Sequence, residues 1–222
     1  ATRRKIVRVH AATILPLLGL YIALAPWAVP VVFGEQWSPA IVPSQILAVA
    51  GMVAAIVTGL GPMMMAVGRP GALLAFNTVA CAIYATMVFL LAPLGIIAVS
   101  IGVAGFHLVT LAASQYLLLD RICGIRTRDT AAEIGPAILA TAVTTAITAA
   151  AANALDPIGV PPVAVVCIAG LAGAGAFCWI LRAAFPDLAA EMISLVRRVL
   201  PSRLRAPSRL RPAATPAPQG RA

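Results

Sequence analysis

Long apolar stretches alternate with short polar connections through most of the sequence. Each stretch has roughly the 20 residues that a helix needs to cross a lipid bilayer. We therefore expect six spans, at residues 11–33, 40–67, 72–91, 96–119, 131–152 and 163–181. The pattern predicts an all-α integral membrane protein with six transmembrane helices.

Proline and glycine indicate where these spans bend. Pro16, Pro26 and Pro30 fall inside the first span, where neighbouring helices can satisfy the carbonyl groups that proline leaves without a donor. This favours a kinked packing helix over a gating hinge. In the second span, residues 59–62 read Gly-Leu-Gly-Pro and predict a kink or break.

Polar and small side chains recur at helical spacing inside the spans. Residues three and four apart share one face of a helix, and a polar face in a membrane helix turns toward the bundle or a cavity. The polar sets are Asn77, Cys81 and Tyr84 in the third span, Ser100, His107, Thr110 and Ser114 in the fourth, and Thr141, Thr144, Thr145 and Thr148 in the fifth. In the sixth span, Ala169 with Gly173 and Gly170 with Ala174 predict close helix approach.

The charges are few and clustered. Of 222 residues, 61% are hydrophobic and only 10% are charged, whereas soluble proteins carry about 25% charged residues. The net charge of +9 could suggest nucleic acid, but the cations lie in short clusters between apolar spans. We read them as topology signals and expect no nucleic-acid partner.

The cations fix a membrane orientation. With six spans and both termini in the cytoplasm, all 16 Lys and Arg residues fall on the cytoplasmic side. We expect a basic lead-in at residues 1–10 and a membrane lobe over 11–183. An amphipathic juxtamembrane helix should cover 186–200, and the Pro- and Arg-rich composition of 201–222 predicts a disordered tail.

The sequence lacks the usual enzyme motifs. It contains no HExxH, GxSxG, Walker A motif or paired intramembrane carboxylates, so we expect neither catalysis nor a cofactor. No CxxC links the four cysteines, and no metal site is expected. Glu35 and Asp156 are expected outside the cell, and the other five carboxylates, Glu133 among them, on or near the inside.

Five residues are candidates for lining a substrate cavity: Arg69, Asn77, His107, Thr110 and Ser114. His107 lies near the middle of its span and could contact a phosphate or relay a proton, or could be a neutral histidine bonded between helices. Arg69 could bind a phosphate, or serve only as a topology charge at a turn.

Several turns suggest a family. Residues 34–40 read Gly-Glu-Gln-Trp-Ser-Pro-Ala and resemble the G-E-x-W-x-P-A turn of bacterial polysaccharide-transporter flippases, within the multidrug/oligosaccharidyl-lipid/polysaccharide exporter superfamily. Residues 46–51 (Ile-Leu-Ala-Val-Ala-Gly), 66–70 (Ala-Val-Gly-Arg-Pro) and 95–100 (Gly-Ile-Ile-Ala-Val-Ser) resemble later segments of that family. The resemblance covers roughly residues 1–125.

The resemblance implies a carrier that flips a lipid-linked pyrophosphate sugar, such as a lipopolysaccharide or exopolysaccharide precursor, across the bacterial inner membrane. It implies two lobes around a central cavity, of which this chain would form the C-terminal one, with an N-terminal lobe supplied in cis or in trans. Two alternatives stay open. The first is a drug or cation exporter of the same superfamily, which would want an intramembrane acid that we do not expect in these spans. The second is a structural membrane subunit without transport of its own.

Overall fold

The computed structural model describes residues 2–57, 60–186 and 190. In this part of the chain the regular structure is helical, without strands, and six helical segments are long and apolar enough to cross a membrane. The predicted all-α membrane fold with six spans is thus confirmed. The expected helix at 186–200 and the tail at 201–222 fall almost wholly outside the described residues.

The helices follow the predicted spans with shifted ends. The main helices are α1 (Thr2–Phe33), α2 (Ile41–Val57), α3 (Leu60–Ala66), α4 (Pro70–Leu91), α5 (Ile96–Ser114), α6 (Arg121–Cys123), α7 (Thr127–Leu155) and α8 (Pro162–Ala184). Short turns of helix complete the chain: η1 (Glu35–Ala40), η2 (Ala92–Leu94), the π-helical η3 (Gln115–Asp120) and η4 (Asp156–Ile158). Helices α2 and α3 lie in the second span, and residues 58–59, where the predicted break begins, are outside the described residues. The fifth is longer at both ends than predicted.

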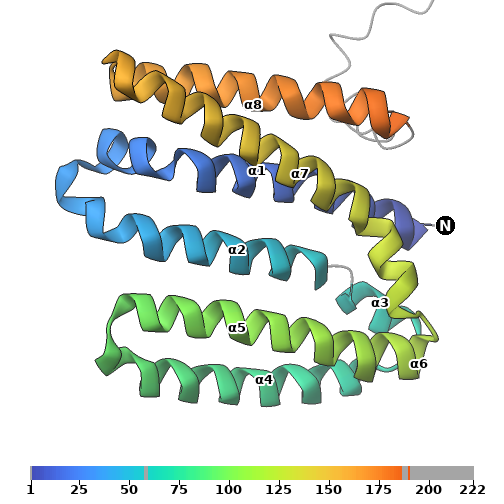
Figure 1. Cartoon of the computed structure of the whole chain (residues 1–222). Helices are drawn as coiled ribbons and strands as arrows, with labels where there is room; N and C mark the ends of the chain where they lie inside the picture. The colour runs from blue at the N-terminus through green and yellow to red at the C-terminus, as the bar shows by residue number, and fades with distance from the viewer. Residues whose placement is uncertain (1, 58–59, 187–189, 191–222) are drawn as a thin grey trace, which may run out of the picture.

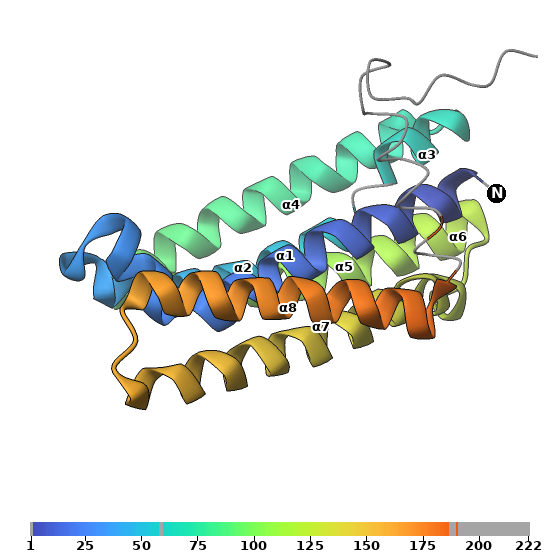
Figure 2. The ribbon, with the colours of Figure 1, turned by 90° about the horizontal axis from the view of Figure 1, so that it is seen from above.

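Three antiparallel hairpins make up the bundle: α1 with α2, α4 with α5, and α7 with α8 (Figure 1). Helix α1 lies at the centre and contacts α2, α7 and α8. Helix α5 packs on α2, and α4 packs on α5 at the edge of the bundle (Figures 1 and 2). The order across the molecule is therefore α7 and α8, then α1, α2, α5 and α4.

A hydrogen bond between helices compensates for a proline in α1. Pro26 has no N–H, so it cannot satisfy the carbonyl of Ile22 four residues earlier. The side chain of Gln45 on α2 donates from Nε2 to that carbonyl oxygen at 2.8 Å. Helix α1 continues through Pro16, Pro26 and Pro30.

The threonine-rich face of α7 lies in the tightest contact of the bundle. Thr141, Thr144 and Thr148 are buried, and the hydroxyl of Thr148 donates to the carbonyl of Thr144 at 2.8 Å. Glycines lie opposite this face. A Cβ atom added at Gly19 of α1 would come within 2.8 Å of Cγ2 of Thr141, and one at Gly173 of α8 would meet Oγ1 of Thr148.

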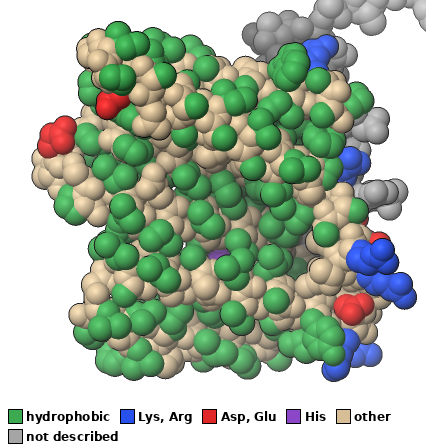
Figure 3. Space-filling view, viewed as in Figure 1, with side chains coloured by type: hydrophobic (Ala, Val, Ile, Leu, Met, Phe, Trp, Pro, Cys, Tyr) green, Lys and Arg blue, Asp and Glu red, His purple; other side chains and the backbone are tan. Residues whose placement is uncertain are grey.

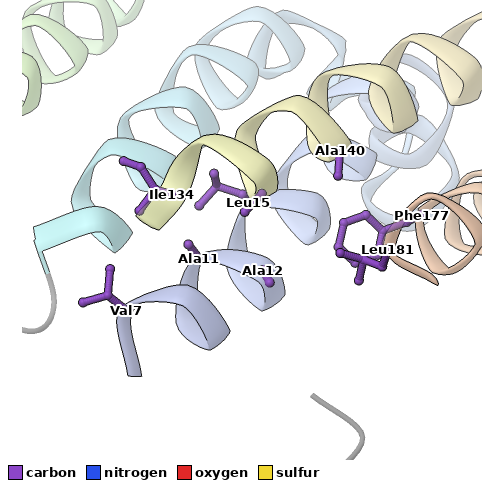
Figure 4. Close-up of a cluster of buried hydrophobic side chains, with 9 residues drawn as sticks. Val7, Ala11, Ala12, Leu15, Ile134, Ala140, Phe177 and Leu181 are labelled. Atoms are coloured by element: carbon purple, nitrogen blue, oxygen red, sulfur yellow. The ribbon is translucent and has the colours of Figure 1, made fainter. Parts of the chain in front are cut away.

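The core joins the same three helices. Small and branched side chains of α1 meet α7 and α8 in one cluster, consisting of Val7, Ala11, Ala12, Leu15, Ile134, Ala137, Ala140, Phe177 and Leu181 (Figure 4). On α8 the buried positions recur every four residues and include Ala169 and Gly173. The predicted close approach at this pair is confirmed.

The described charges separate to the two ends of the bundle. Arginines gather where α1 begins and α8 ends, which we call the cationic end (Figure 3). They are Arg8, Arg69, Arg121, Arg126, Arg128 and Arg182. Glu35 and Asp156 lie at the opposite end, where the Trp27 indole N–H donates to the Asp156 carboxylate at 3.0 Å. The apolar length between the ends is the part that hydrocarbon surrounds.

Replacing Gln45 by leucine tests the contact with α1. The change keeps the side chain's bulk but leaves the Ile22 carbonyl without its donor, which should cost about 1–3 kcal/mol. We expect a lower melting temperature in detergent and faster amide exchange around Pro26. Ser44→Ala is the control, because the Ser44 hydroxyl donates only to the Ile41 carbonyl of its own helix. Equal melting temperatures for the two variants would contradict this role of Gln45.

Two glycines of α8 form a matched pair for testing the α7 contact. In Gly173→Ala the new Cβ would lie 2.5 Å from Cδ2 of Leu20 as well as against Thr148, so we expect a loss of about 1–3 kcal/mol from overpacking. At Gly175 an added Cβ meets nothing within 4 Å. Gly175→Ala should be neutral or stabilise the helix by up to about 1 kcal/mol. Thermal unfolding in detergent measures both, and a Gly173→Ala protein as stable as Gly175→Ala would refute the tight packing.

Candidate functional site

A groove of about 350 Å³ opens at the cationic end, between α2, the α5–η3 segment and α7. We call it the inner groove; the surface is hollowed in this region between α2 and α5 (Figure 3). Its apolar lining consists of Ile56, Leu108, Leu111, Ala112, Ala131 and Ile134. Its polar lining consists of Gln115, Tyr116, Thr127 and Thr130. The groove is therefore amphipathic, with a volume in the range of small-molecule pockets.

The backbone changes its winding where it forms one wall of this groove. After Ser114, α5 continues as the π-helical η3 (Gln115–Asp120), a rare geometry that often occurs at functional sites. Gln115 is only 6% exposed, and its Nε2 donates to the carbonyl of Ile125 at 3.0 Å. The first residue of the π turn thereby holds the connection to α7 against the groove.

Tyr116 lines the groove, and Arg121 contacts Tyr116 without lining the groove itself. Arg121 donates from a terminal guanidinium nitrogen to the Tyr116 hydroxyl at 2.9 Å, and its guanidinium carbon lies 4.8 Å from the centre of the Tyr116 ring. Such a cation–π contact fixes the guanidinium over the ring. Since an arginine has five N–H donors, the pair leaves Arg121 able to donate to an anion at the mouth of the groove.

Ser114 borders a smaller space beside the groove. This space has a volume of about 20 Å³ and includes Ser114, Gln115 and Thr130 among its lining residues, which is room for about one water molecule. The Ser114 hydroxyl itself donates to the Leu111 carbonyl at 3.0 Å. Of the five residues predicted to line a substrate cavity, Ser114 is thus the one nearest the inner groove.

The other four predicted residues do not line the inner groove. Arg69 is exposed between α3 and α4, where its backbone N–H donates to the Met64 carbonyl at 3.0 Å. Asn77 is exposed on α4, and Thr110 is half-buried on α5. Their role at a substrate cavity stays a prediction.

One ring nitrogen of His107 makes a hydrogen bond within α5. Nδ1 lies 2.9 Å from the Val103 carbonyl oxygen, and because a carbonyl only accepts, this contact places the proton of a neutral ring on Nδ1. Nε2 is then the acceptor. Phe106 packs edge-on to the His107 ring and also to Tyr84 of α4, so aromatic contacts hold the half-buried imidazole beside the α4–α5 interface.

Sequence reasoning missed most residues of the inner groove. Thr127 and Thr130 lie before the expected start of the fifth span at residue 131, but the structure includes both in α7. The expected loop began at Asp120, but the chain remains helical through Cys123. Gln115 carried a usable signal, since it is a side-chain amide inside an apolar span.

Glu133 is a buried carboxylate. The sequence predicted it on or near the inside, and it lies six residues after the start of α7 at the cationic end, only 7% exposed. The described residues contain no group of three His, Cys, Asp or Glu side chains that could hold a metal ion. Their four cysteines are free thiols.

Comparison with protein-family models, with curated proteins and with solved structures finds no match to this chain. The description of the six-helix membrane bundle and its grooves therefore rests on the structure of this chain alone. The resemblance to polysaccharide-transporter flippases remains a prediction from the sequence.

Proposed function

We propose that this chain forms part of a carrier that moves a lipid-linked oligosaccharide or polysaccharide precursor across a bacterial inner membrane. The observation that carries the proposal is a pair of polar side chains at membrane depth, of which Asn77 is exposed and His107 half-buried. Asn77 lies about 10 Å along α4 from Pro70, and His107 about 16 Å along α5 from Ile96, at a rise of 1.5 Å per residue. Neither side chain is buried.

Polar groups at that depth require water or a protein partner, because hydrocarbon cannot satisfy them. Every residue of α4 is described, and none is buried. Its only main contacts are α5 and α3. A water-filled passage, or a second lobe facing α4 and α5, accounts for both features, and either one suits a carrier of an amphipathic substrate.

Three of the four segments that resemble the flippase family include a turn between helices, while residues 46–51 lie within α2. Gly34, Gly68 and Gly95 have φ angles of +95°, +73° and +94°, a region that residues other than glycine rarely adopt. The shared glycines therefore have a physical role in reversing the chain. This supports the resemblance in hairpin architecture, while the substrate rests on the family likeness.

A drug or cation exporter is the second candidate, and Glu133 favours it. Such exporters couple transport to an intramembrane acid, and Glu133 is buried in α7 close to the inner groove residue Thr130. Export of a cationic dye that is lost in Glu133→Gln, with saccharide export unchanged, would favour this candidate. The third candidate is a structural subunit without transport of its own. In that case Glu133→Gln would change neither dye export nor saccharide export.

The orientation is also proposed: the cationic end faces the cytoplasm, by the positive-inside rule. Cysteine probes introduced at Gln36 and Asp156 should react with an impermeant reagent added to intact cells. Probes at Arg69 and Arg126 should react only after the cells are opened. Labelling at Arg126 in intact cells would reverse the orientation.

The function is tested with His107→Leu and Asn77→Leu in bacteria whose gene for this chain carries the change. Each should lower saccharide export, normalised to expression, by at least about tenfold, the effect of roughly 1.4 kcal/mol. The fold should tolerate His107→Leu, because the Val103 carbonyl keeps its helical amide donor. The melting temperature in detergent should therefore stay close to that of the parent.

Thr78→Val is the matched control, since Thr78 adjoins Asn77 and its hydroxyl donates to the Leu74 carbonyl of its own helix. It should leave export unchanged. Normal export by His107→Leu with a lowered melting temperature would assign this histidine to packing. Normal export by both leucine variants would reject the proposed passage along α4 and α5.

A further inference from the structure

The inner groove is complete within this chain. Its walls come from α2, α5, η3 and α7, and its apolar side chains lie on helices that span the membrane. In a bilayer, the molecule available to such an opening at all times is lipid. A site that needs no second lobe is therefore distinct from the uncovered surface of α4 and α5.

The apolar part of the groove fits a hydrocarbon chain. Leu108, Leu111 and Ile134 form walls without charge, and Ala112 and Ala131 leave room between them. Both alanines are exposed. Short side chains on facing helices keep a slot open that leucine or phenylalanine would close, and contact of a chain with such walls contributes many small dispersion terms.

The polar end fits a phosphate. Thr127 lines the groove as the first residue of α7, and that helix begins without a side-chain cap. The N–H groups of Thr127 and Arg128 and the positive dipole end favour an anion, while the N–H of Asp129 in the same turn donates to the Arg126 carbonyl. Arg121 contacts Tyr116, which lines the groove, while Gln115, which is more than nine-tenths buried, closes the floor.

The charge of the surrounding surface agrees. Among the residues whose side chains are described, the cationic end carries six arginines against three carboxylates, Asp120, Asp129 and Glu133. Basic pockets between transmembrane helices are a known type of site for anionic lipid headgroups. Along α7, the polar residue Thr127 lies nearer the cationic end and the apolar residue Ile134 lies further into the bundle. A lipid of that leaflet places its headgroup and its acyl chain in the same order.

We propose that the inner groove binds one anionic phospholipid of the leaflet at the cationic end. One acyl chain lies between α5 and α7, and the phosphate lies among Arg121, Thr127 and the first turn of α7. A groove of about 350 Å³ covers part of one acyl chain, and the rest of the lipid lies at its mouth. This lipid is a resident ligand and not the transported substrate. The inference does not depend on the proposed function.

The test uses the full chain, purified in detergent and equilibrated with mixed micelles that contain equal amounts of phosphatidylglycerol and phosphatidylcholine. Native mass spectrometry then counts the bound lipid. We expect one retained phosphatidylglycerol per chain. Ala131→Phe should fill the slot and remove it, whereas Ala132→Phe should not, because Ala132 is equally exposed and adjacent but does not line the groove.

A second pair tests the headgroup. Arg121→Gln should lower the preference for phosphatidylglycerol over phosphatidylcholine by about fivefold, the effect of one cation near an anionic lipid. Arg182→Gln removes the same charge from the same end, but on α8 away from the groove. It should leave the preference unchanged. Melting temperatures of all four variants show whether each is folded.

Three results would overturn the proposal. They are equal retention by Ala131→Phe and Ala132→Phe, an equal loss of preference in Arg121→Gln and Arg182→Gln, and displacement of phosphatidylglycerol by an equimolar isoprenoid phosphate. The last result would assign the groove to a carrier lipid. None of the three depends on export, so failure here leaves the proposed transport function standing.

Discussion

The close contact of α7 with α1 and α8 is the interaction on which the rest of the bundle depends. In hydrocarbon, an apolar side chain gains little by leaving lipid, so helices associate through tight packing and hydrogen bonds. Alanine and threonine on α7 are short enough to let Gly19 and Gly173 approach. Helix α2 then packs on α1, α5 packs on α2, and α4 packs on α5. Burial falls along this series until α4, fully described, buries no residue.

The same constraint explains which polar groups the bundle satisfies. Gln45 supplies the donor that Pro26 removes, and Trp27 ties the end of α1 to Asp156. The first bond joins α2 to α1, and the second joins α1 to η4. Asn77 and Nε2 of His107 lie at the edge of the series, beyond the tight contacts. Polar groups of that kind must be satisfied by something outside the bundle, and for that reason they indicate function better than the buried threonines do.

The sequence predicted the elements better than the site. The six spans and the buried face of α8 with Ala169 and Gly173 follow from composition and spacing alone. The fifth span has the lowest mean hydropathy of the six. Its helix still packs closely against α1 and α8, because alanine and threonine side chains are small. The inner groove could not be predicted, since it depends on a π turn at Gln115 and on α7 beginning at Thr127. The sequence has no local signal for a π turn that begins at Gln115 or for a helix that begins at Thr127. The charged residues between 120 and 129 indicate a loop instead.

The two polar surfaces differ in whether the chain itself closes them, and this difference separates their physical roles. The inner groove has walls on three sides and a floor at Gln115, so a ligand there can be held by this chain alone. The face with Asn77 and His107 has only α4 and α5 behind it. A ligand on that face would be held from one side, which suits a substrate that must be released on the far side of the membrane. A lipid held in the groove would brace α7 against α5, two helices whose direct contact is slight, and would thereby stiffen the end of the bundle from which such a substrate enters.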